Sequence, residues 1–166
     1  MSDMQPTHAT PGGDRAGAAG DAPATVAERA ARAMWSGDAA SKWFGIERGR
    51  VTEGGARMTL DVAPHHCNGH GTCHGGVIFA LADTAFAFAC NSRNQATVAM
   101  HCVVSFMAPA RAGDRLEAVA EEVDLTGRNG IYDVTVLGPD GHVAHFRGIS
   151  RTIPGRLYDP AEGAGA

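Results

Sequence analysis

One carboxylate is a candidate for chemistry because of its surroundings. Asp83 is the only charged residue between Val77 and Cys90, a stretch that is otherwise almost entirely apolar. Burying a carboxylate costs free energy unless the group is paired or performs a function. Asp83 can serve as a general base that activates water, or as a nucleophile. A structural aspartate, hydrogen-bonded to Thr84, a neighbouring loop or a partner chain, is the alternative.

Two glycines stand eight and seven residues before this carboxylate. Gly75 and Gly76 lie where the apolar stretch begins, so we expect them to open a helix. The first N–H groups of a helix have no partner within it, and the helix dipole reinforces them. They can therefore bind an oxygen that becomes negative during a reaction. Close packing of the helix on a sheet would also favour glycine here.

The loop before Gly75 is crowded with histidine and cysteine. Six residues of HHCNGHGTCH have these types: His65, His66, Cys67, His70, Cys73 and His74. Zinc sites use such side chains, but the loop has no C-x-x-C pair and its glycines oppose a helical H-x-x-x-H arrangement. We therefore expect no bound metal. His74 is expected either to touch a substrate or to bond to the backbone.

The elements that position these residues begin with a short helical lead. Thr25-Val26-Ala27-Glu28 has the form of a capping box and predicts a helix over about 26–36. A second short turn follows, in which Trp43 and Phe44 are expected to cover one edge of a sheet. The pattern then alternates on both sides of Glu53-Gly54-Gly55, which predicts a hairpin.

The rest of the chain predicts one central helix and several strands. The stretch from about 75 to 91 is apolar nearly all round, as expected of a buried helix. At least three strand-like segments follow, separated by turns such as GRNG and GPDG. Because strands and helices do not alternate, the expected class is α+β, with an antiparallel sheet wrapped around the long helix.

Several of these residues together resemble a known family. The pattern comprises Asn68, His74-Gly75-Gly76, Leu81-Ala82-Asp83-Thr84-Ala85 and the helix end AFAFACNS. It resembles hotdog-fold acyl-CoA thioesterases of the PaaI phenylacetate-pathway type, over about residues 25–153. The combined pattern is far more specific than HGG alone.

The resemblance implies roles for individual residues. It implies that Asp83 is the catalytic carboxylate, that the Gly75 N–H donates to the thioester carbonyl, and that the Asn68 side chain orients the reacting groups. It also implies an aromatic or medium-size acyl group, such as phenylacetyl or its hydroxylated products. Coenzyme A is then part of the substrate, and no separate cofactor is expected.

Contacts to coenzyme A are harder to place. The sequence has neither a Walker A motif nor G-x-G-x-x-G, so side chains or loop amides must hold the phosphates. Candidates are Arg111, Arg128 and Asn129, the last two lying in a turn that is otherwise a plain exposed hairpin turn. An acyl pocket or an ordinary core are alternative roles for five apolar residues: Phe79, Phe86, Phe88, Phe106 and Met107.

Helix geometry argues for shared sites. Eight residues at 1.5 Å rise place Gly75 and Asp83 about 12 Å apart on one helix, whereas a reacting carbonyl must lie about 3 Å from both. Two antiparallel helices related by a twofold axis would bring Gly75 of one chain near Asp83 of the other. We therefore expect a homodimer, and the resemblance adds a tetramer of two dimers.

Composition limits the remaining possibilities. The 166 residues suit one domain, with tails expected at 1–24 and 154–166. A net charge of −4 argues against broad binding to nucleic acid or acidic membranes. The longest apolar run is too short to span a bilayer and no signal peptide is recognisable, so we expect a cytoplasmic protein with reduced cysteines.

Two other functions remain open at this point. A hotdog enoyl-CoA hydratase would need an Asp/His acid–base pair, for which His74 and His101 are the candidate partners of Asp83. A non-catalytic acyl-CoA sensor would bind ligand in the same pocket without turnover. The sequence also does not choose between general-base and nucleophilic roles for Asp83.

Overall fold

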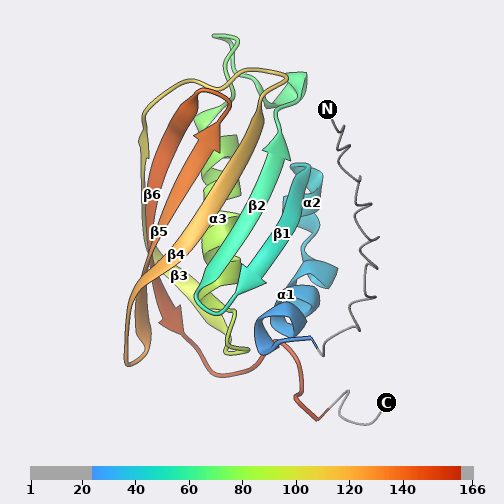
Figure 1. Ribbon diagram of the computed structural model, residues 1–166, viewed down its shortest axis with the longest axis vertical. Helices are drawn as coiled ribbons and strands as arrows, with labels where there is room; N and C mark the ends of the chain where they lie inside the picture. Colours follow the sequence, from blue (N-terminus) through green and yellow to red (C-terminus); the bar gives the residue numbers. More distant parts are fainter. Residues whose placement is uncertain (1–23, 162–166) are drawn as a thin grey trace, which may run out of the picture.

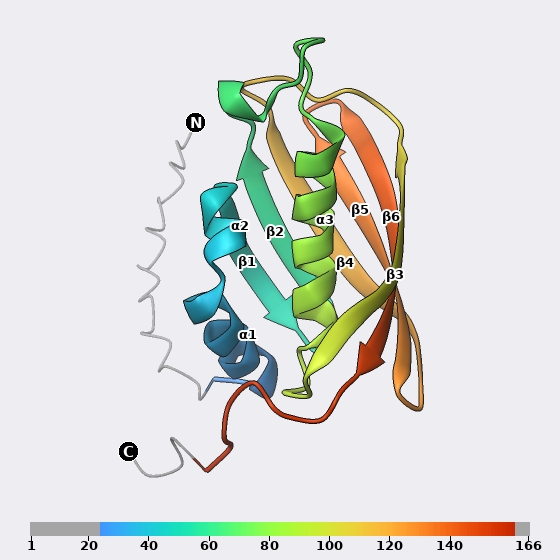
Figure 2. The ribbon, with the colours of Figure 1, turned by 180° about the vertical axis from the view of Figure 1, so that it is seen from behind.

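The computed structural model of the chain describes residues 24–161, in which a six-stranded antiparallel sheet curves around one long helix (Figure 1). The view from behind shows the helix lying in the hollow of the sheet (Figure 2). In chain order the elements are α1 (Val26–Gly37), α2 (Ala39–Trp43), β1 (Ile46–Thr52), β2 (Gly55–Asp61), η1 (Pro64–His66), α3 (Gly75–Cys90), β3 (Thr97–Phe106), β4 (Arg115–Thr126), β5 (Asn129–Gly138) and β6 (Gly141–Thr152).

The central helix is α3, and the α+β hotdog architecture expected from the sequence is confirmed. α3 packs against all six strands, and its side chains are buried on most of its surface. The strands present alternate residues to it, as half-buried strands do. Inward-facing residues that are almost wholly buried include Met58, Leu60, Leu116, Val134 and Phe146.

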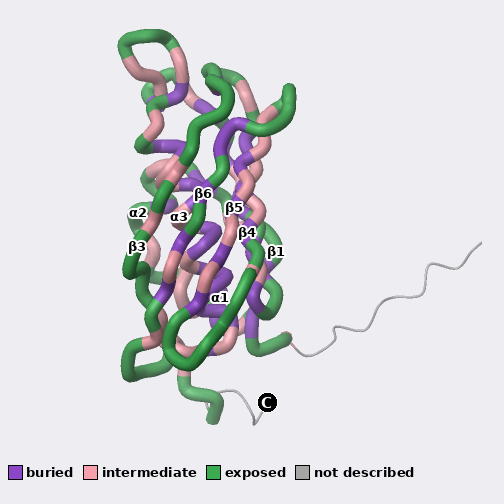
Figure 3. The backbone as a smooth tube through the Cα atoms, turned by 90° about the vertical axis from the view of Figure 1, so that its left-hand side faces the viewer, coloured by how far each residue is buried: buried purple, intermediate pink, exposed green. Residues whose placement is uncertain are grey.

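The sheet order is β1-β2-β4-β5-β6-β3, so the chain crosses to the far edge of the sheet after α3. β3 pairs only with β6 and leaves its other edge without a partner among the described residues. Figure 3 shows that most of β3 is exposed or half-buried. The strand order therefore leaves β3 as an edge strand with an open face.

The helical lead follows the sequence prediction except at one aromatic residue. Thr25 and Glu28 form the full capping box, and α1 begins at the residue after Thr25. Asp38 caps α2 through the Ser41 N–H. Phe44 packs against the core, but Trp43 is 77% exposed. The expectation that Trp43 covers a sheet edge is wrong, because its side chain lies mostly in solvent and packs edge-on against Phe44.

The structure describes only residue 24 of the predicted N-terminal tail, but residues 154–161 of the predicted C-terminal tail. Residues 1–23 of the predicted N-terminal tail lie outside the described residues. Beyond β6, the Leu157 and Tyr158 N–H groups donate to Oδ1 of Asn94, and Gly155 O accepts from Ala96 N–H. None of the described helices is long and apolar enough to cross a membrane.

Candidate active site

The N-terminus of α3 presents one free backbone donor. His74 precedes the helix in an extended conformation, and its Nδ1 accepts a 2.9 Å hydrogen bond from the Gly76 N–H. Within residues 24–161, the Gly75 N–H donates to no acceptor. It points outward at the positive end of the helix dipole. This donor can therefore stabilise an oxygen that becomes negative.

A cavity of about 370 Å³ lies at this donor. The ring of Phe106 lies against Gly75, since a Cβ on this glycine would be 3.0 Å from Cζ of the ring. A larger, polar cavity of about 650 Å³ lies over β1, β2 and β4 and contains none of the predicted site residues. The smaller cavity is lined by Thr72, Cys73, Gly75, Ile78, Phe106, Met107, Ala108 and Pro109.

Asn68 organises the loop that leads to α3. Its Oδ1 accepts from the His70 N–H at 2.9 Å and from the N–H and hydroxyl of Thr72 at 3.4 and 3.3 Å. The carbonyl oxygen of the side chain is therefore used in folding the loop. Any orienting role toward a ligand is left to the amide nitrogen, which can only donate.

Asp83 lies half-buried in the middle of α3 and faces β3. Its Oδ1 is 3.9 Å from Sγ of Cys102, and it forms no ion pair with any described residue. The Thr84 hydroxyl is hydrogen-bonded to Ser41 at 3.1 Å and not to this carboxylate. Asp83 is thus a partly desolvated carboxylate without a cation.

Burial is the main cause of the pKa shifts of Asp83 and Cys102. Desolvation raises the pKa of Asp83 above its usual value of 3.8, and the Cys102 S–H opposes this only in part. Burial, together with the neighbouring Asp83, raises the pKa of Cys102 to about 11. The thiol is therefore protonated at neutral pH and can donate to the carboxylate.

The two candidate groups, the Gly75 N–H and the Asp83 carboxylate, are separated along a single unbroken helix. Gly75 is the first residue of α3 and Asp83 lies eight residues later, which corresponds to about 12 Å along the axis. One carbonyl cannot contact both groups within one chain. The geometry of the described chain thus brings Gly75 and His74 together and leaves Asp83 apart.

The candidate coenzyme contacts are also divided. Arg111 follows Ala110, whose carbonyl accepts from the Cys73 N–H, so Arg111 lies near the start of α3. Arg128 donates to the Thr152 carbonyl at 2.9 and 3.2 Å. The β4–β5 turn that holds Arg128 and Asn129 lies at the opposite end of the molecule from the start of α3 (Figure 2).

The aromatic residues divide between core and cavity. Phe86 and Phe88 are fully buried core residues. Phe79 packs edge-on against Phe146, with ring centroids 5.4 Å apart. Of the five apolar residues considered for an acyl pocket, Phe106 and Met107 line the cavity beside Gly75.

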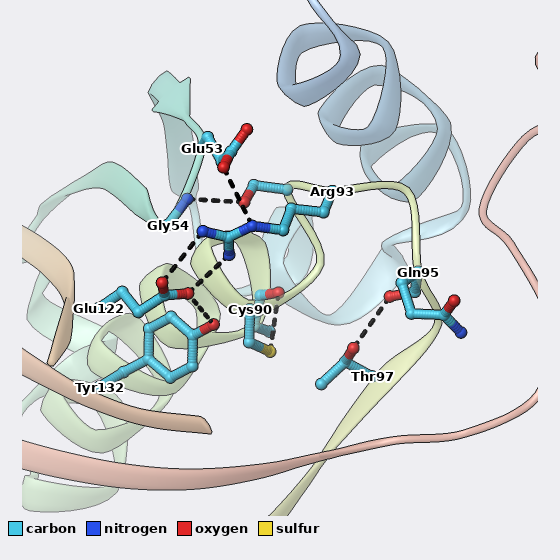
Figure 4. A network of polar contacts seen from close by, with 10 residues as sticks. Glu53, Gly54, Cys90, Arg93, Gln95, Thr97, Glu122 and Tyr132 are labelled. Carbon is cyan, nitrogen blue, oxygen red and sulfur yellow. Dashed lines mark hydrogen bonds and ion pairs between the residues drawn. The ribbon is translucent and has the colours of Figure 1, made fainter. Parts of the chain in front are cut away.

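A polar network near the end of α3 was missed by sequence reasoning. Arg93 bonds to both oxygens of Glu122 at 2.6 and 3.0 Å and to Glu53 at 3.2 Å, and the Tyr132 hydroxyl donates to Glu122 at 2.7 Å (Figure 4). Burial alone would raise the pKa of Glu122, but these donors outweigh it and lower the pKa. The network joins the segment after α3 to the β1–β2 turn, β4 and β5, and its members are too far apart in sequence to reveal it.

The histidine- and cysteine-rich loop uses several of its side chains in local bonds. His66 Nδ1 accepts from the Ala63 N–H at 3.0 Å, as His74 Nδ1 does from Gly76. The backbones of Cys67 and Cys73 pair in an isolated antiparallel β-bridge. No three His, Cys, Asp or Glu side chains in the described part of the chain gather as metal ligands do.

Comparison with known proteins identifies similar sequences and folds. A family model described as the thioesterase superfamily matches residues 70–145. The chain is 43% identical to the acyl-coenzyme A thioesterase PaaI of Escherichia coli K12 over 132 residues, 79% of this chain and 94% of that protein.

Solved structures agree with the sequence comparison. The E. coli PaaI protein of the phenylacetic acid degradation operon superposes with a TM-score of 0.77 at 42% identity, covering 79% of this chain and 96% of that one. A mutant of PaaI from Thermus thermophilus gives 0.66 at 37% identity, covering 68% and 97%. A Streptococcus mutans protein bound to acetyl-CoA shares the fold, with 0.64 at 22% identity over 67% and 90%.

Proposed function

Because this chain belongs to the thioesterase superfamily, as an acyl-CoA thioesterase of the PaaI type, we propose that it hydrolyses aromatic or medium-size acyl-CoA thioesters. The E. coli relative is named an acyl-CoA thioesterase, and its solved structure is described as that of a protein from the phenylacetic acid degradation operon. Phenylacetyl-CoA and its hydroxylated products are therefore the substrates we propose first.

The observation that most supports this proposal is the free Gly75 N–H beside an apolar cavity. The thioester carbonyl accepts this bond, which stabilises the oxygen as it becomes negative. Asp83 either removes a proton from the attacking water or attacks the carbonyl carbon itself. In both routes the C–S bond breaks, water supplies the acid oxygen, and coenzyme A leaves as the thiol.

We propose that each site combines Gly75 of one chain with Asp83 of a second. The 12 Å separation along α3 requires this if both groups contact one carbonyl. The free edge of β3 exposes apolar side chains that a second copy would cover, namely Val98, Met100 and Val103, which are 45, 53 and 52% exposed.

A hydratase finds less support than a thioesterase. His101 is exposed, and Cys102, the next residue along β3, is the one that meets Asp83. Adjacent strand residues point to opposite faces, so His101 faces away from the carboxylate of its own chain. His74 uses Nδ1 to cap α3. Within one chain, neither imidazole is therefore paired with Asp83 as a hydratase would require.

The test is loss of thioester absorbance with acetyl-, hexanoyl-, palmitoyl-, benzoyl- and phenylacetyl-CoA, run on the wild type and on Asp83→Asn. We expect hydrolysis to peak on an aromatic substrate and to fall at least a hundredfold in the variant. Asp61→Asn, a change in an exposed ion pair, is the matched control and should keep activity. A chelator should change nothing, since we propose no metal or separate cofactor.

Two results would contradict the proposal. If no thioester is hydrolysed while acyl-CoA still binds, the chain is a sensor rather than an enzyme. If Asp83→Asn hydrolyses at the wild-type rate, the carboxylate has no part in the chemistry.

A further inference from the structure

A third cavity, remote from β3, lies between the first helix and the opposite edge of the sheet. It has a volume of about 400 Å³, within the range of roughly 300–1,000 Å³ that is usual for small-molecule sites. α1 lies beside the lower half of β1 in Figure 1, and these two elements supply its walls. The lining residues are Ala24, Glu28, Arg32, Arg48, Gly49, Arg50 and Val51. We call it the arginine cleft.

A β-bulge places two of its arginines. Arg48 pairs with Met58 and Val51 pairs with Ala56, so two residues of β1 oppose a single residue of β2. Gly49 permits the bulge, since a Cβ there would lie 2.7 Å from a β2 carbonyl oxygen. Such bulges redirect side chains. Because cross-strand partners share a face and Met58 is fully buried, Arg48 points to the inner face of the sheet, under α1.

Arg48 is left with an unsatisfied donor. Its Nε is buried and has no hydrogen-bond partner. A buried donor without an acceptor costs folding free energy, and the cost is greater for a charged group. A ligand oxygen would remove this cost if the Arg48 side chain turns its Nε–H toward the cleft on binding.

The cleft also carries net positive charge, from three arginines against one glutamate. Four arginines elsewhere form ion pairs: Arg57, Arg93, Arg115 and Arg147. Among the described residues, Arg32, Arg48 and Arg50 have no carboxylate within 4 Å. The Glu28 carboxylate accepts hydrogen bonds from the N–H and hydroxyl of Thr25. These bonds, together with the positive charges of Arg32 and Arg50, lower the pKa of Glu28.

We propose that the arginine cleft binds a small molecule through its phosphate group. Three guanidinium groups around one cavity, including a buried Nε–H without an acceptor, match the several oxygens of a phosphate. The cleft lies at the β1 edge of the sheet, whereas Asp83 faces β3 at the other edge. The site is therefore separate from the thioesterase centre.

The test is calorimetric titration of the full chain with inorganic phosphate, pyrophosphate and adenosine diphosphate at fixed ionic strength. We expect saturable binding of one ligand per chain, about tenfold or more weaker in Arg48→Met and in Arg50→Gln. Arg50 is exposed, so its variant keeps the test valid if Arg48→Met fails to fold. Arg57→Gln, a paired arginine one strand away, is the control and should bind as the wild type does.

The three titrants separate the possible sources of the phosphate. Phosphate binding as tight as that of the nucleotide assigns the cleft to the free anion, and tighter nucleotide binding assigns it to a phosphorylated metabolite. Either supports the proposal. It is overturned if no titrant binds saturably, or if Arg57→Gln weakens binding as much as Arg48→Met does.

Discussion

Asp83 and Gly75 are the residues on which the proposed chemistry depends, and each sits in an environment that a purely structural residue would not need. Asp83 holds a carboxylate against a thiol rather than a cation. Gly75 holds an N–H without an acceptor in the described chain. Desolvation of the Asp83 carboxylate costs stability in the free protein, and both features favour a reacting thioester, which is typical of functional sites.

Asp83→Asn should stabilise the fold at neutral pH. Burial raises the pKa of Asp83, so the folded state favours the protonated acid. Its contribution to stability is greatest below the unfolded-state pKa of about 3.9 and is lost as pH rises through the folded-state pKa. Melting curves should therefore coincide for the wild type and the variant near pH 3, and the variant should melt higher at pH 7.

Asp61→Asn provides the contrast for this prediction, because Asp61 forms an exposed ion pair with Arg115. It should not raise the melting temperature at pH 7. A lower melting temperature of Asp83→Asn at pH 7 would mean that the charge of Asp83 is stabilised in the native protein, contrary to our account.

Substituting Gly75 with proline or with alanine distinguishes the loss of the backbone N–H from the steric effect of an added Cβ. Gly75 is the first residue of α3, where proline is tolerated, and His74 before it is already extended. Both variants add a Cβ next to the flexible ring of Phe106, but only proline removes the donor. Gly75→Pro should lower kcat about a hundredfold or more relative to Gly75→Ala, as loss of an oxyanion donor does. Equal kcat values would show that this N–H does not act in catalysis.

At the scale of elements, α3 carries both groups of the proposed site, and its first turn depends on a side-chain cap. His74 Nδ1 accepts from the Gly76 N–H, which serves the purpose that Ser, Asn or Asp serves at most helix starts. The cap holds the first turn of α3, whose first residue, Gly75, lines the cavity. Histidine at this position is therefore explained by structure before any chemistry is assigned to it.

His74→Ala should lower the free energy of unfolding by about 1 kcal/mol, measured by urea denaturation, and His74→Ser should restore most of it. If His74 acts only as a cap, His74→Ser also restores hydrolysis. Stability that recovers while hydrolysis stays low would instead assign the imidazole a contact with substrate.

The elements were largely predictable because local sequence signals specify them. The Thr25–Glu28 box, the Glu53-Gly54-Gly55 turn and the apolar run of α3 each gave the correct element. Contacts between distant segments were not predictable. The Arg93–Glu122–Tyr132 network and the Asp83–Cys102 contact depend on strand order and register, which no local pattern encodes. The roles proposed for Asp83 and Gly75 come from the family resemblance, and the structure added the distances and contacts around them.

At the scale of the whole molecule, β3 is the strand of the described chain whose free edge we expect a partner to cover. It forms one edge of the sheet and exposes an apolar row, and long apolar edges of this kind are sites of association. A second copy along β3 would also bring a second α3 close to the first. Association and activity should therefore be linked.

Met100→Asp tests this link, because Met100 is 53% exposed in the single chain and would be buried by a partner. An unpaired buried charge costs about 3 kcal/mol or more, which weakens association about a hundredfold. Sedimentation should show dissociation, with hydrolysis lost in parallel. Val123→Asp, at a 54% exposed position away from the β3 edge, should change neither. A fully active Met100→Asp monomer would rule out shared sites.

The most direct test of the central claim is hydrolysis of phenylacetyl-CoA by mixed subunits. Asp83→Asn and Gly75→Pro chains, each inactive alone, are mixed in equal amounts and allowed to exchange, with exchange verified by differently sized tags. Each mixed dimer then contains one intact pair of Gly75 and Asp83, and random exchange should restore about a quarter of wild-type activity. No recovery in verified mixed dimers would contradict a site built from Gly75 of one chain and Asp83 of the other.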